Sequence, residues 1–360
     1  PGEAPAPASA PAQAPAASQA SVLSALQQLR QNLADWEIST DSVDIERDET
    51  LGFGSTSVVF KGWVSGVPVA VKESHILAAE RQRGQAATGP IMAAIRELEI
   101  WPEIRHPSIL KFLGVCFSED LSVVRIISQC CLGGSLFDLL HNAWYIELRA
   151  AQKKCCLEDV SSALSYLHGF RKPVMHRDVK SLNILVLEPI VDGTSELKAK
   201  LADFGFARSK PDWAYEDLTS GAGTPHWMAP EVCHGNDYHT KADVFSFAVV
   251  MYEVVCRVMM FEQDIPERVQ RRIGNGERCA LRGTPAQTHV PPGTPEGLLD
   301  LMAQCWSQDA SKRPSMADVH ARIVAIDWRD KGVRFSGDPA ADQPGCASGA
   351  PAPSAARKKK

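Results

Sequence analysis

The order of apolar and polar residues predicts two strands and a helix in the first third of the chain. Residues 58–60 read Val-Val-Phe and residues 69–71 read Val-Ala-Val, a composition that favours strands. Residues 90–104 carry apolar side chains at positions 91, 95, 98 and 101, which is the spacing of an amphipathic helix. Pro102 lies inside this pattern, and its ring clashes with the carbonyl four residues earlier. We therefore expect the helix to kink or loosen near its C-terminal end.

Two further apolar patterns predict helices. Residues 21–33 carry apolar side chains at positions 22, 26, 29 and 33, again at helical spacing. We interpret this segment as a short helix packed on the folded domain, with a self-associating segment as the alternative. The strongly apolar run that begins near residue 241 and ends near residue 256 is too short to cross a bilayer. It therefore predicts a buried core helix.

Both ends of the chain differ in composition from the middle. Residues 1–20 contain fourteen Ala or Pro residues, and from about residue 336 the sequence again turns to Ala, Pro and Gly. Segments of this composition bury too little apolar surface to fold. We therefore expect disorder over residues 1–20 and 327–360. The polar insertion at residues 78–89 predicts a surface loop.

The overall composition is that of a globular protein with reduced cysteines. Of the 360 residues 44% are hydrophobic, enough for a core of roughly 250–300 residues. The net charge of −5 implies no general attraction to nucleic acids or membranes. The ten cysteines show no paired spacing typical of zinc sites, and most lie in apolar runs. Because no signal peptide or membrane-spanning run is present, we expect a cytoplasmic protein without a membrane span.

A glycine-bearing segment at residues 51–57 is a candidate phosphate-binding loop. Gly52 and Gly54 have no Cβ atom, so their backbone amides can approach anionic oxygens closely. A dinucleotide-binding turn would continue into a helix, whereas this segment continues into the strand at residues 58–60. The segment is therefore expected to be the tip of a hairpin.

Two polar motifs further along the chain carry candidate catalytic groups. Residues 176–183 read His-Arg-Asp-Val-Lys-Ser-Leu-Asn, and twenty residues after Asn183 the sequence reads Asp-Phe-Gly from Asp203. Asp178 can accept a proton from a hydroxyl nucleophile, while Asn183 and Asp203 can share Mg²⁺ bound to a triphosphate. Either motif alone would occur by chance, but both together in this order indicate phosphoryl transfer.

Together these motifs resemble the catalytic core of the eukaryotic protein kinases. The resemblance covers residues 45–326 and implies an α+β fold with two lobes. The small lobe, residues 45–131, would hold an antiparallel sheet and one main helix. The larger lobe, residues 132–326, would be mainly helical. Residues 21–44 would form a short helix and a lead-in to the domain.

The resemblance implies a catalytic role for each matching residue. Lys72, which ends the Val-Ala-Val strand 20 residues after Gly52, would hold the α- and β-phosphates of ATP. Its partner would be Glu97, the glutamate nine residues before His106. Asp178 would deprotonate the acceptor hydroxyl, and Lys180 would steady the γ-phosphate. Mg²⁺ would be bound by Asn183 and Asp203, as stated above.

The resemblance also places the nucleotide between the two lobes. The residues expected to line the ATP site are Leu51, Gly52, Phe53, Gly54, Ser55, Ser57, Val59, Ala70, Lys72, Ser128, Gln129, Cys131 and Leu185. The adenine edge would bond to the backbone of Gln129 and Cys131. Ser57 stands where the family pattern has a third glycine, and because serine is small we expect the loop to keep its shape with less backbone freedom.

Further residues are implied to shape and regulate the site. Residues 223–231 resemble the substrate-docking end of an activation segment, in which Glu231 would pair with Arg313. Asp243 would hydrogen-bond to the backbone of the catalytic loop. Our hypothesis is that Thr219 or Ser220 of the activation segment is phosphorylated and that Arg177 binds the added phosphate group. Thr224 would stay unmodified, with its hydroxyl near Asp178 and Lys180. The alternative is that these hydroxyls are only solvated loop groups.

Within the family, the amino-acid sequence of several motifs resembles that of the tyrosine-kinase-like (mixed-lineage and Raf-like) group. The matching segments are residues 36–38, 176–183, 223–231 and 305–315. That group mostly phosphorylates Ser and Thr, and Lys180 is the residue that Ser/Thr kinases carry. We therefore expect a protein serine/threonine kinase with protein substrates. A pseudokinase scaffold and a dual-specificity or tyrosine kinase are the alternatives.

Overall fold

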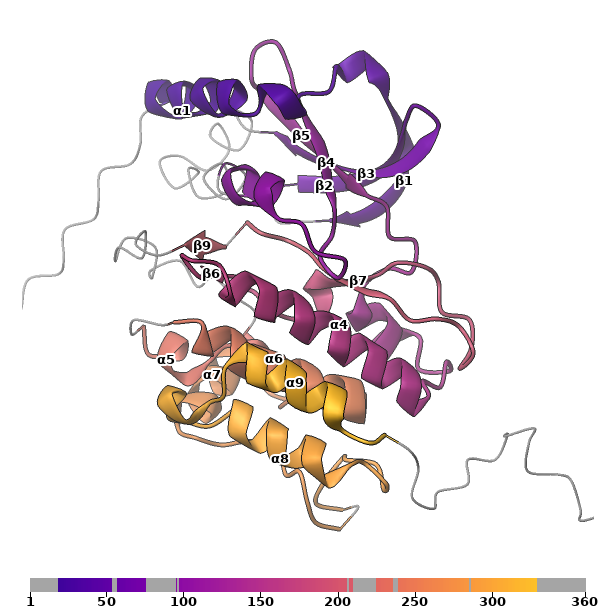
Figure 1. Cartoon of the computed structure of the whole chain (residues 1–360), viewed down its shortest axis with the longest axis vertical. Helices are drawn as coiled ribbons and strands as arrows, with labels where there is room; N and C mark the ends of the chain where they lie inside the picture. Colours follow the sequence, from indigo (N-terminus) through magenta and orange to yellow (C-terminus); the bar gives the residue numbers. More distant parts are fainter. Residues whose placement is uncertain are drawn as a thin grey trace, which may run out of the picture.

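The computed structural model describes residues 19–53, 57–75, 95, 97–205, 207–209, 225–235, 239–284 and 286–328. Within these ranges the chain forms two lobes, with a sheet in the upper lobe and mostly helices in the lower one (Figure 1). This arrangement is the two-lobed α+β fold predicted from the sequence. The predicted surface loop at residues 78–89 and most of the predicted disordered ends lie outside the described residues.

The upper lobe is built on a five-stranded antiparallel sheet with the order β1-β2-β3-β5-β4. Its strands are β1 (Val43–Phe53), β2 (Ser57–Val64), β3 (Val67–His75), β4 (Phe112–Phe117) and β5 (Val123–Gln129). Both strands predicted in the first third of the chain are confirmed, as parts of β2 and β3. Gly52 pairs with Val59 and Phe53 with Val58, so the glycine-bearing segment joins β1 to β2 as the predicted hairpin.

Of the helix predicted over residues 90–104, the structure describes residue 95 and residues 97–104, and its geometry changes at the proline. Residues 97–100 are α-helical and continue into the 3₁₀ helix η4 (Trp101–Glu103), in which Pro102 occupies the first turn. Leu98 and Trp101 are buried, as the amphipathic spacing predicted. A proline lacks the N–H that an α-helix needs and fits the first turn of a helical segment, so the loosening predicted near Pro102 takes the form of this switch.

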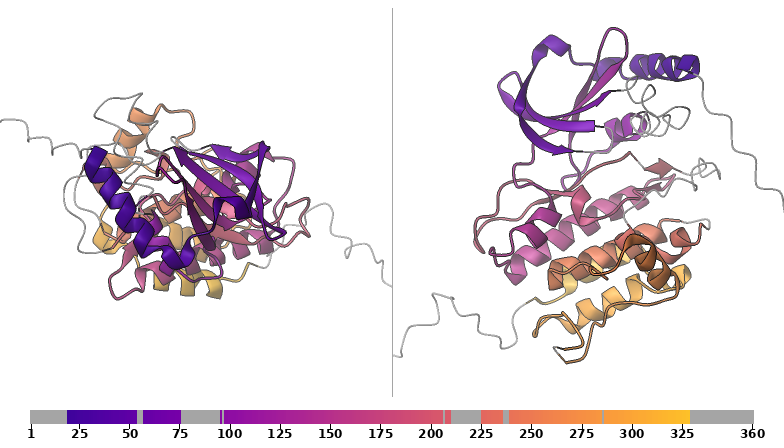
Figure 2. Two further views of the ribbon diagram at one scale, coloured as in Figure 1. Left: turned by 90° about the horizontal axis from the view of Figure 1, so that it is seen from above. Right: turned by 180° about the vertical axis from the view of Figure 1, so that it is seen from behind.

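The helix α1 (Gln19–Asn32) packs on the upper lobe above the helical segment that carries Glu97 (Figures 1 and 2). Its buried side chains Leu26 and Leu29 belong to the main apolar cluster of the protein. These contacts agree with the packed-helix interpretation, and self-association through residues 21–33 stays a prediction. The helix begins at Gln19, which is earlier than the expected end of the disordered segment at residue 20.

The lower lobe is mainly helical and contains two short strand pairs. Its α-helices are α4 (Ala150–His168), α5 (Pro230–Cys233), α6 (Lys241–Cys256), α7 (Pro266–Gly274), α8 (Glu296–Cys305) and α9 (Met316–Ala325). The strand pairs are β6 (Val174–Met175) with β9 (Arg208–Ser209), and β7 (Ile184–Val186) with β8 (Ala199–Leu201). Trp328, two residues after the predicted boundary at residue 326, packs against the apolar cluster.

The helix α6 is the buried core helix that the apolar run predicted. Nearly every side chain from Ala242 to Val255 is buried. Arg257 directly follows the last residue of the helix, and its φ of 55° is in the left-handed region. The Arg257 guanidinium donates hydrogen bonds to backbone carbonyls that follow β5, including that of Leu139 at 2.7 Å. The side chain of Arg257 therefore joins the end of α6 to the segment that follows β5.

None of the helices among the described residues has the length and the apolar composition needed to cross a membrane. All nine cysteines among the described residues are free thiols.

Candidate active site

The loop between β6 and β7 brings three of the predicted catalytic residues together. Asn183 Nδ2 donates hydrogen bonds to Asp178 Oδ2 at 2.8 Å and to the Asp178 carbonyl at 2.9 Å. Lys180 Nζ lies 2.7 Å from Asp178 Oδ2. Asp178 and Asn183 are both buried, so these contacts are shielded from water. The loop therefore presents a carboxylate, an ammonium and an amide within one small volume.

The conformation of this loop depends on Asp243 of α6. Its two carboxylate oxygens accept hydrogen bonds from the backbone N–H groups of His176 and Arg177, each at 2.9 Å. Burial alone would raise the pKa of Asp243, but the hydrogen bond and charge of His168 outweigh this effect and lower it. The buried carboxylate is therefore held ionised against the start of the loop, in the place that the kinase resemblance implied.

Asp203 lies across from Asn183 because β7 and β8 pair. Ile184 is opposite Leu201, and Ala202 N donates to the Asn183 carbonyl at 2.9 Å. Asp203 has a φ of 68° and Arg177 a φ of 69°, both in the left-handed region that non-glycine residues rarely adopt. Such backbone strain concentrates at functional sites, and here it occurs on both segments that carry the acidic residues.

Lys72 of β3 lies between two carboxylates. Its Nζ atom is 2.8 Å from Glu97 Oε2 and 3.5 Å from Asp203 Oδ1. Burial would lower the pKa of Lys72, but the nearby charges of Asp203 and Glu97 raise it. The charge of Lys72 in turn lowers the pKa of Asp203. Burial raises the pKa of Glu97, with Lys72 opposing that shift. The lysine is thus held charged at the point where the two lobes meet.

The described residues predicted to line the nucleotide site come from β1, β2, β3, β5, the segment after β5 and, in the lower lobe, β7. Ala70 pairs with Lys61 on one side and with Ser128 on the other, which places it in the centre of the sheet. Gln129 N donates to the Lys111 carbonyl at 3.0 Å. Among the described residues, no carbonyl accepts a hydrogen bond from the amide of Cys131. That amide is therefore available to a ligand.

The chain then crosses to the lower lobe at two glycines. Gly133 N donates to the Val186 carbonyl at 3.0 Å, and a Cβ atom on Gly133 would lie only 2.7 Å from that oxygen. Gly134 has a φ of 71°, in the region that favours glycine. Leu185 lies next to this crossing, because Ser135 and Leu185 form a bridge. The crossing therefore sets Leu185 of the lower lobe beneath the sheet that carries Ala70.

The predicted phosphate-binding and activation segments are only partly described. Leu51, Gly52 and Phe53 end β1, and Ser57 and Val59 begin β2. The Phe53 side chain is 82% exposed. Gly54, Ser55, Thr219, Ser220 and Thr224 lie outside the described residues.

The pairing expected between Glu231 and Arg313 is present. The two guanidinium nitrogens of Arg313 lie 2.7 and 2.8 Å from the two carboxylate oxygens of Glu231. Arg313 is 1% exposed and also donates to the carbonyls of Ser307 and Lys241, each at 2.9 Å. This bidentate pair joins α5, just after the substrate-docking segment, to the end of the lower lobe.

Two buried carboxylates were missed by the sequence reasoning. Glu253 of α6 contacts the catalytic loop, and Glu73 of β3 lies between Arg47 and Arg125. Glu253 could have been noticed as a lone acidic residue inside an apolar run. Glu73 has no such signal, because its partners are 26 and 52 residues away in the sequence.

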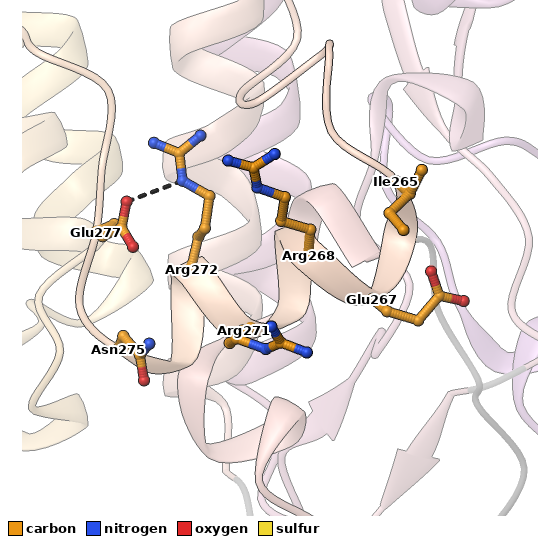
Figure 3. Close-up of a pocket in the computed structure, with 7 residues that line it drawn as sticks. All are labelled: Ile265, Glu267, Arg268, Arg271, Arg272, Asn275 and Glu277. Carbon is orange, nitrogen blue, oxygen red and sulfur yellow. Dashed lines mark hydrogen bonds and ion pairs between the residues drawn. The ribbon is translucent and has the colours of Figure 1, made fainter.

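A surface pocket of about 450 Å³ lies along α7, apart from all these residues (Figure 3). It is lined by Ile265, Glu267, Arg268, Arg271, Arg272, Asn275 and Glu277. Arg272 pairs with Glu277 at 2.8 Å and with Asp264 at 2.6 Å. Arg268 also pairs with Asp264, at 3.1 Å, so two of the three arginines that line the pocket are matched by carboxylates on or beside it.

The geometry of the site agrees with comparisons to known proteins. Residues 45–323 match the protein kinase domain family. The chain belongs to this family. The kinase domain is 32% identical over 295 residues to a serine/threonine-protein kinase/receptor of Acanthamoeba polyphaga mimivirus, covering 82% of this chain and 16% of that protein.

Two further relatives of the kinase domain show the same partial coverage. The serine/threonine-protein kinase STY17 of Arabidopsis thaliana is 31% identical over 286 residues, covering 79% of this chain and 45% of that protein. The dual specificity protein kinase splA of Dictyostelium discoideum is 27% identical over 311 residues, covering 82% of this chain and 12% of that protein. The chain therefore spans less than half of the length of each of these relatives.

Proposed function

We propose that this domain transfers the γ-phosphoryl group of ATP to serine or threonine hydroxyls of protein substrates. The observation that carries the proposal is the meeting of two clusters. Lys72 with Glu97 comes from the upper lobe, Asp178 with Asn183 comes from the lower lobe, and Asp203 lies between them. Phosphoryl transfer depends almost entirely on positioning and charge stabilisation, which these groups can supply.

Lys72 is assigned to the α- and β-phosphates of ATP. Its contact with Glu97 fixes the ammonium on the central strand of the sheet, and its raised pKa keeps it charged at neutral pH. The hairpin of β1 and β2 would cover the phosphates from above, with Gly52 allowing close approach of the backbone. The adenine ring would lie between Val59 and Ala70 on one side and Leu185 on the other.

The edge of the adenine is assigned to the segment after β5. The amide of Cys131 has no carbonyl partner among the described residues and can donate to a ring nitrogen. The amide of Gln129 already donates to Lys111, so Gln129 would contribute its carbonyl to the exocyclic amine. Ser128 lies directly before Gln129 on β5.

Asp178 is assigned as the general base. A protein hydroxyl approaching the γ-phosphate would donate a hydrogen bond to its carboxylate, which takes the proton as the new P–O bond forms and the bond to ADP breaks. Lys180, at 2.7 Å from Asp178, would neutralise charge on the γ-phosphate. Because Asn183 Nδ2 donates twice to Asp178, the base is held in one orientation.

Asn183 and Asp203 fit a Mg²⁺ ion bound with ATP. Both hydrogen bonds of Asn183 to Asp178 use Nδ2, so its Oδ1 is left for a cation, and Asp203 supplies a carboxylate whose pKa is lowered. Hard oxygen ligands of this kind suit Mg²⁺, which keeps several waters and binds few protein groups. When bound, Mg²⁺ neutralises charge that develops on the phosphate oxygens.

We place the domain in the tyrosine-kinase-like group and assign it to the cytoplasm. The first assignment rests on the sequence around Trp36, Asp178 and Arg313. The second rests on the free thiols, which suit a reducing compartment.

We also propose the domain boundaries at residues 45, 131 and 326 that the sequence predicted. The same holds for the roles predicted in the activation segment for Thr219, Ser220, Thr224 and Arg177. In this scheme Arg177 would bind the added phosphate.

The experiment that tests the function is an assay of ATP-dependent phosphorylation of a generic protein such as myelin basic protein. Phosphoryl transfer that is lost in Asp203→Asn supports the proposal, whereas no transfer by a correctly folded chain supports the pseudokinase. A dual-specificity kinase is the second candidate, favoured by the likeness to splA. Phosphoamino-acid analysis of the product separates the two, because only dual specificity yields phosphotyrosine.

A further inference from the structure

Glu253 is a buried carboxylate that the proposed mechanism does not use. It lies near the C-terminal end of α6 and is 0% exposed. Its Oε1 atom accepts a hydrogen bond from Ser181 Oγ at 2.8 Å and lies 3.1 Å from His141 Nε2. Its Oε2 atom accepts from Trp227 Nε1 at 2.5 Å. Burial raises the pKa of Glu253, and the hydrogen bonds from His141, Trp227 and Ser181 oppose that shift.

Two of these donors belong to segments that carry the proposed chemistry. Ser181 follows Lys180 directly and precedes Asn183 by two residues. Trp227 ends the 3₁₀ helix η8 (Pro225–Trp227), three residues after Thr224 in the substrate-docking sequence. One carboxylate therefore contacts both the catalytic loop and the segment expected to hold the protein substrate.

The helix that carries Glu253 reinforces both contacts. Ser246 Oγ donates to the backbone carbonyl of Trp227 at 2.7 Å, so α6 holds the indole and the backbone of this residue. At its other end Asp243 accepts from the backbone at the start of the catalytic loop. Asp243 and Glu253 are ten residues apart, roughly 15 Å along a helix. Because α6 is buried on nearly all sides, it is a rigid element against which both segments are positioned.

Stability alone does not account for a carboxylate here. Replacing buried ionic groups by apolar residues of similar size is often neutral or stabilising, since desolvation of the charge is costly. An apolar residue at position 253 would fill the core equally well but would accept no hydrogen bond from Ser181 or Trp227. What the carboxylate adds is a fixed relative position of the two donors.

We infer that Glu253 is a positioning residue, which holds the substrate-docking segment at Trp227 in register with the catalytic loop at Ser181. A protein hydroxyl bound on that segment would then lie within reach of Asp178. The inference rests on the proposed kinase function. It concerns binding of the protein substrate and not of ATP, because Glu253 touches none of the residues assigned to the nucleotide.

The test compares Glu253→Gln, Trp227→Phe and Ser181→Ala in steady-state phosphorylation of myelin basic protein. An amide at position 253 offers a single acceptor oxygen, and phenylalanine keeps an aromatic ring but has no N–H. Since a hydrogen bond to a charged group contributes about a tenfold or larger factor, we expect KM for the protein to rise by about tenfold in the first two variants. KM for ATP and the rate of ATP hydrolysis without protein should stay within about twofold.

A double variant and a matched control separate positioning from general damage. Glu253→Gln combined with Trp227→Phe should raise KM for the protein no further than the larger of the two single changes, because both act on the contact between the same two side chains. Trp306→Phe removes another buried indole of the lower lobe that has no bond to Glu253, and it should leave both KM values unchanged. If Glu253→Gln does not fold, Trp227→Phe and Ser181→Ala carry the test.

Three outcomes would overturn the inference while leaving the kinase function intact. These are an unchanged KM for the protein in Trp227→Phe, a parallel rise in KM for ATP, and multiplied effects in the double variant. A folded unsubstituted chain that phosphorylates no protein would instead contradict the proposed function itself, and the inference with it.

Discussion

Lys72 Nζ lies 2.8 Å from Glu97 Oε2, and this pair joins the central strand of the upper sheet to the helix beside it. Glu97 is 2% exposed, so its carboxylate depends on Lys72 for compensation of its charge. Asp203 lies 3.5 Å from the same ammonium and extends the contact to the lower lobe. One lysine therefore links the two lobes and carries a positive charge between two carboxylates.

Replacing Lys72 by methionine should lower turnover by at least about 100-fold, because the site loses a positioned positive charge. Glu97→Gln should lower turnover in the same direction. Initial rates of protein phosphorylation at saturating ATP measure both effects. Lys61→Met is the matched control, since Lys61 lies on the neighbouring strand and pairs with Glu49 at the surface. Equal activity of the Lys72 and Lys61 variants would contradict the assignment of Lys72.

Replacing Asp178 by asparagine should depress turnover by about 10²–10⁴-fold, the usual contribution of a positioned general base. Binding of ATP should persist, because Lys72 and Asp203 are untouched. Turnover is followed as ADP production with protein present, and binding by titration with a fluorescent ATP analogue. Asp192→Asn, which changes an exposed loop carboxylate, is the control and should retain full turnover. Near-normal turnover of Asp178→Asn would show that this carboxylate is not the base.

Replacing Arg313 by alanine should destabilise the lower lobe by about 3–5 kcal/mol, because it leaves Glu231 without its buried partner. For a domain of this size the melting temperature should fall by roughly 6–20 °C. Differential scanning fluorimetry measures the shift. Arg282→Ala is the control, since Arg282 is 49% exposed and its pairs with Glu296 and Asp300 are at the surface. Similar small shifts for both variants would mean that the Glu231 pair contributes little.

How much could be predicted from the sequence depends on whether the signal is local. Strands such as 69–71 and the helix 241–256 follow from apolar patterning within one segment. Glu97 was found only through the family spacing from His106, because three glutamates lie close together between residues 97 and 103. The amphipathic pattern alone does not tell which of them faces Lys72.

The buried contacts of Glu73 and Glu253 could not be predicted from the sequence, because their partners lie far away along the chain. Ser181 lies 72 residues from Glu253, and Trp227 lies 26 residues from it. Such contacts depend on how α6 packs against two loops, which no local periodicity encodes. A kink or loosening of the helix near Pro102 was predicted, since a proline acts on its own backbone, but the sequence did not indicate that it would take the form of a 3₁₀ helix.

The activation hypothesis is tested on the segment after Asp203. Phosphorylation of Thr219 or Ser220 would add a charge of about −2 that suits Arg177. We expect phosphatase treatment of active enzyme to lower its turnover, and the double change Thr219→Ala and Ser220→Ala to do the same. Thr224→Ala should inactivate the enzyme in either state of phosphorylation. Unchanged turnover after phosphatase and in the double variant would contradict the switch.

Glu73 should make the upper lobe sensitive to acid. Its carboxylate is 4% exposed and accepts hydrogen bonds from Arg47 at 2.8 and 2.9 Å and from Arg125 at 2.7 Å. Burial alone would raise the pKa of Glu73, but the two guanidinium groups lower it from 4.5 to about 2. Because the pKa is lower in the folded state, the stabilisation is complete above pH 4.5 and is lost as the pH falls towards about 2.

We therefore expect Glu73→Gln to lower the free energy of unfolding at pH 7 by up to about 3 kcal/mol, the equivalent of this pKa difference. The gap between the variant and the unsubstituted protein should narrow as the pH falls below about 4.5, since protonation removes the same charge. Urea titrations at pH 7, 5, 4 and 3 measure it. Glu49→Gln, at a side chain that is 50% exposed, should show a small gap at every pH. A gap for Glu73→Gln that stays constant with pH would mean that lost packing, and not lost charge, explains the effect.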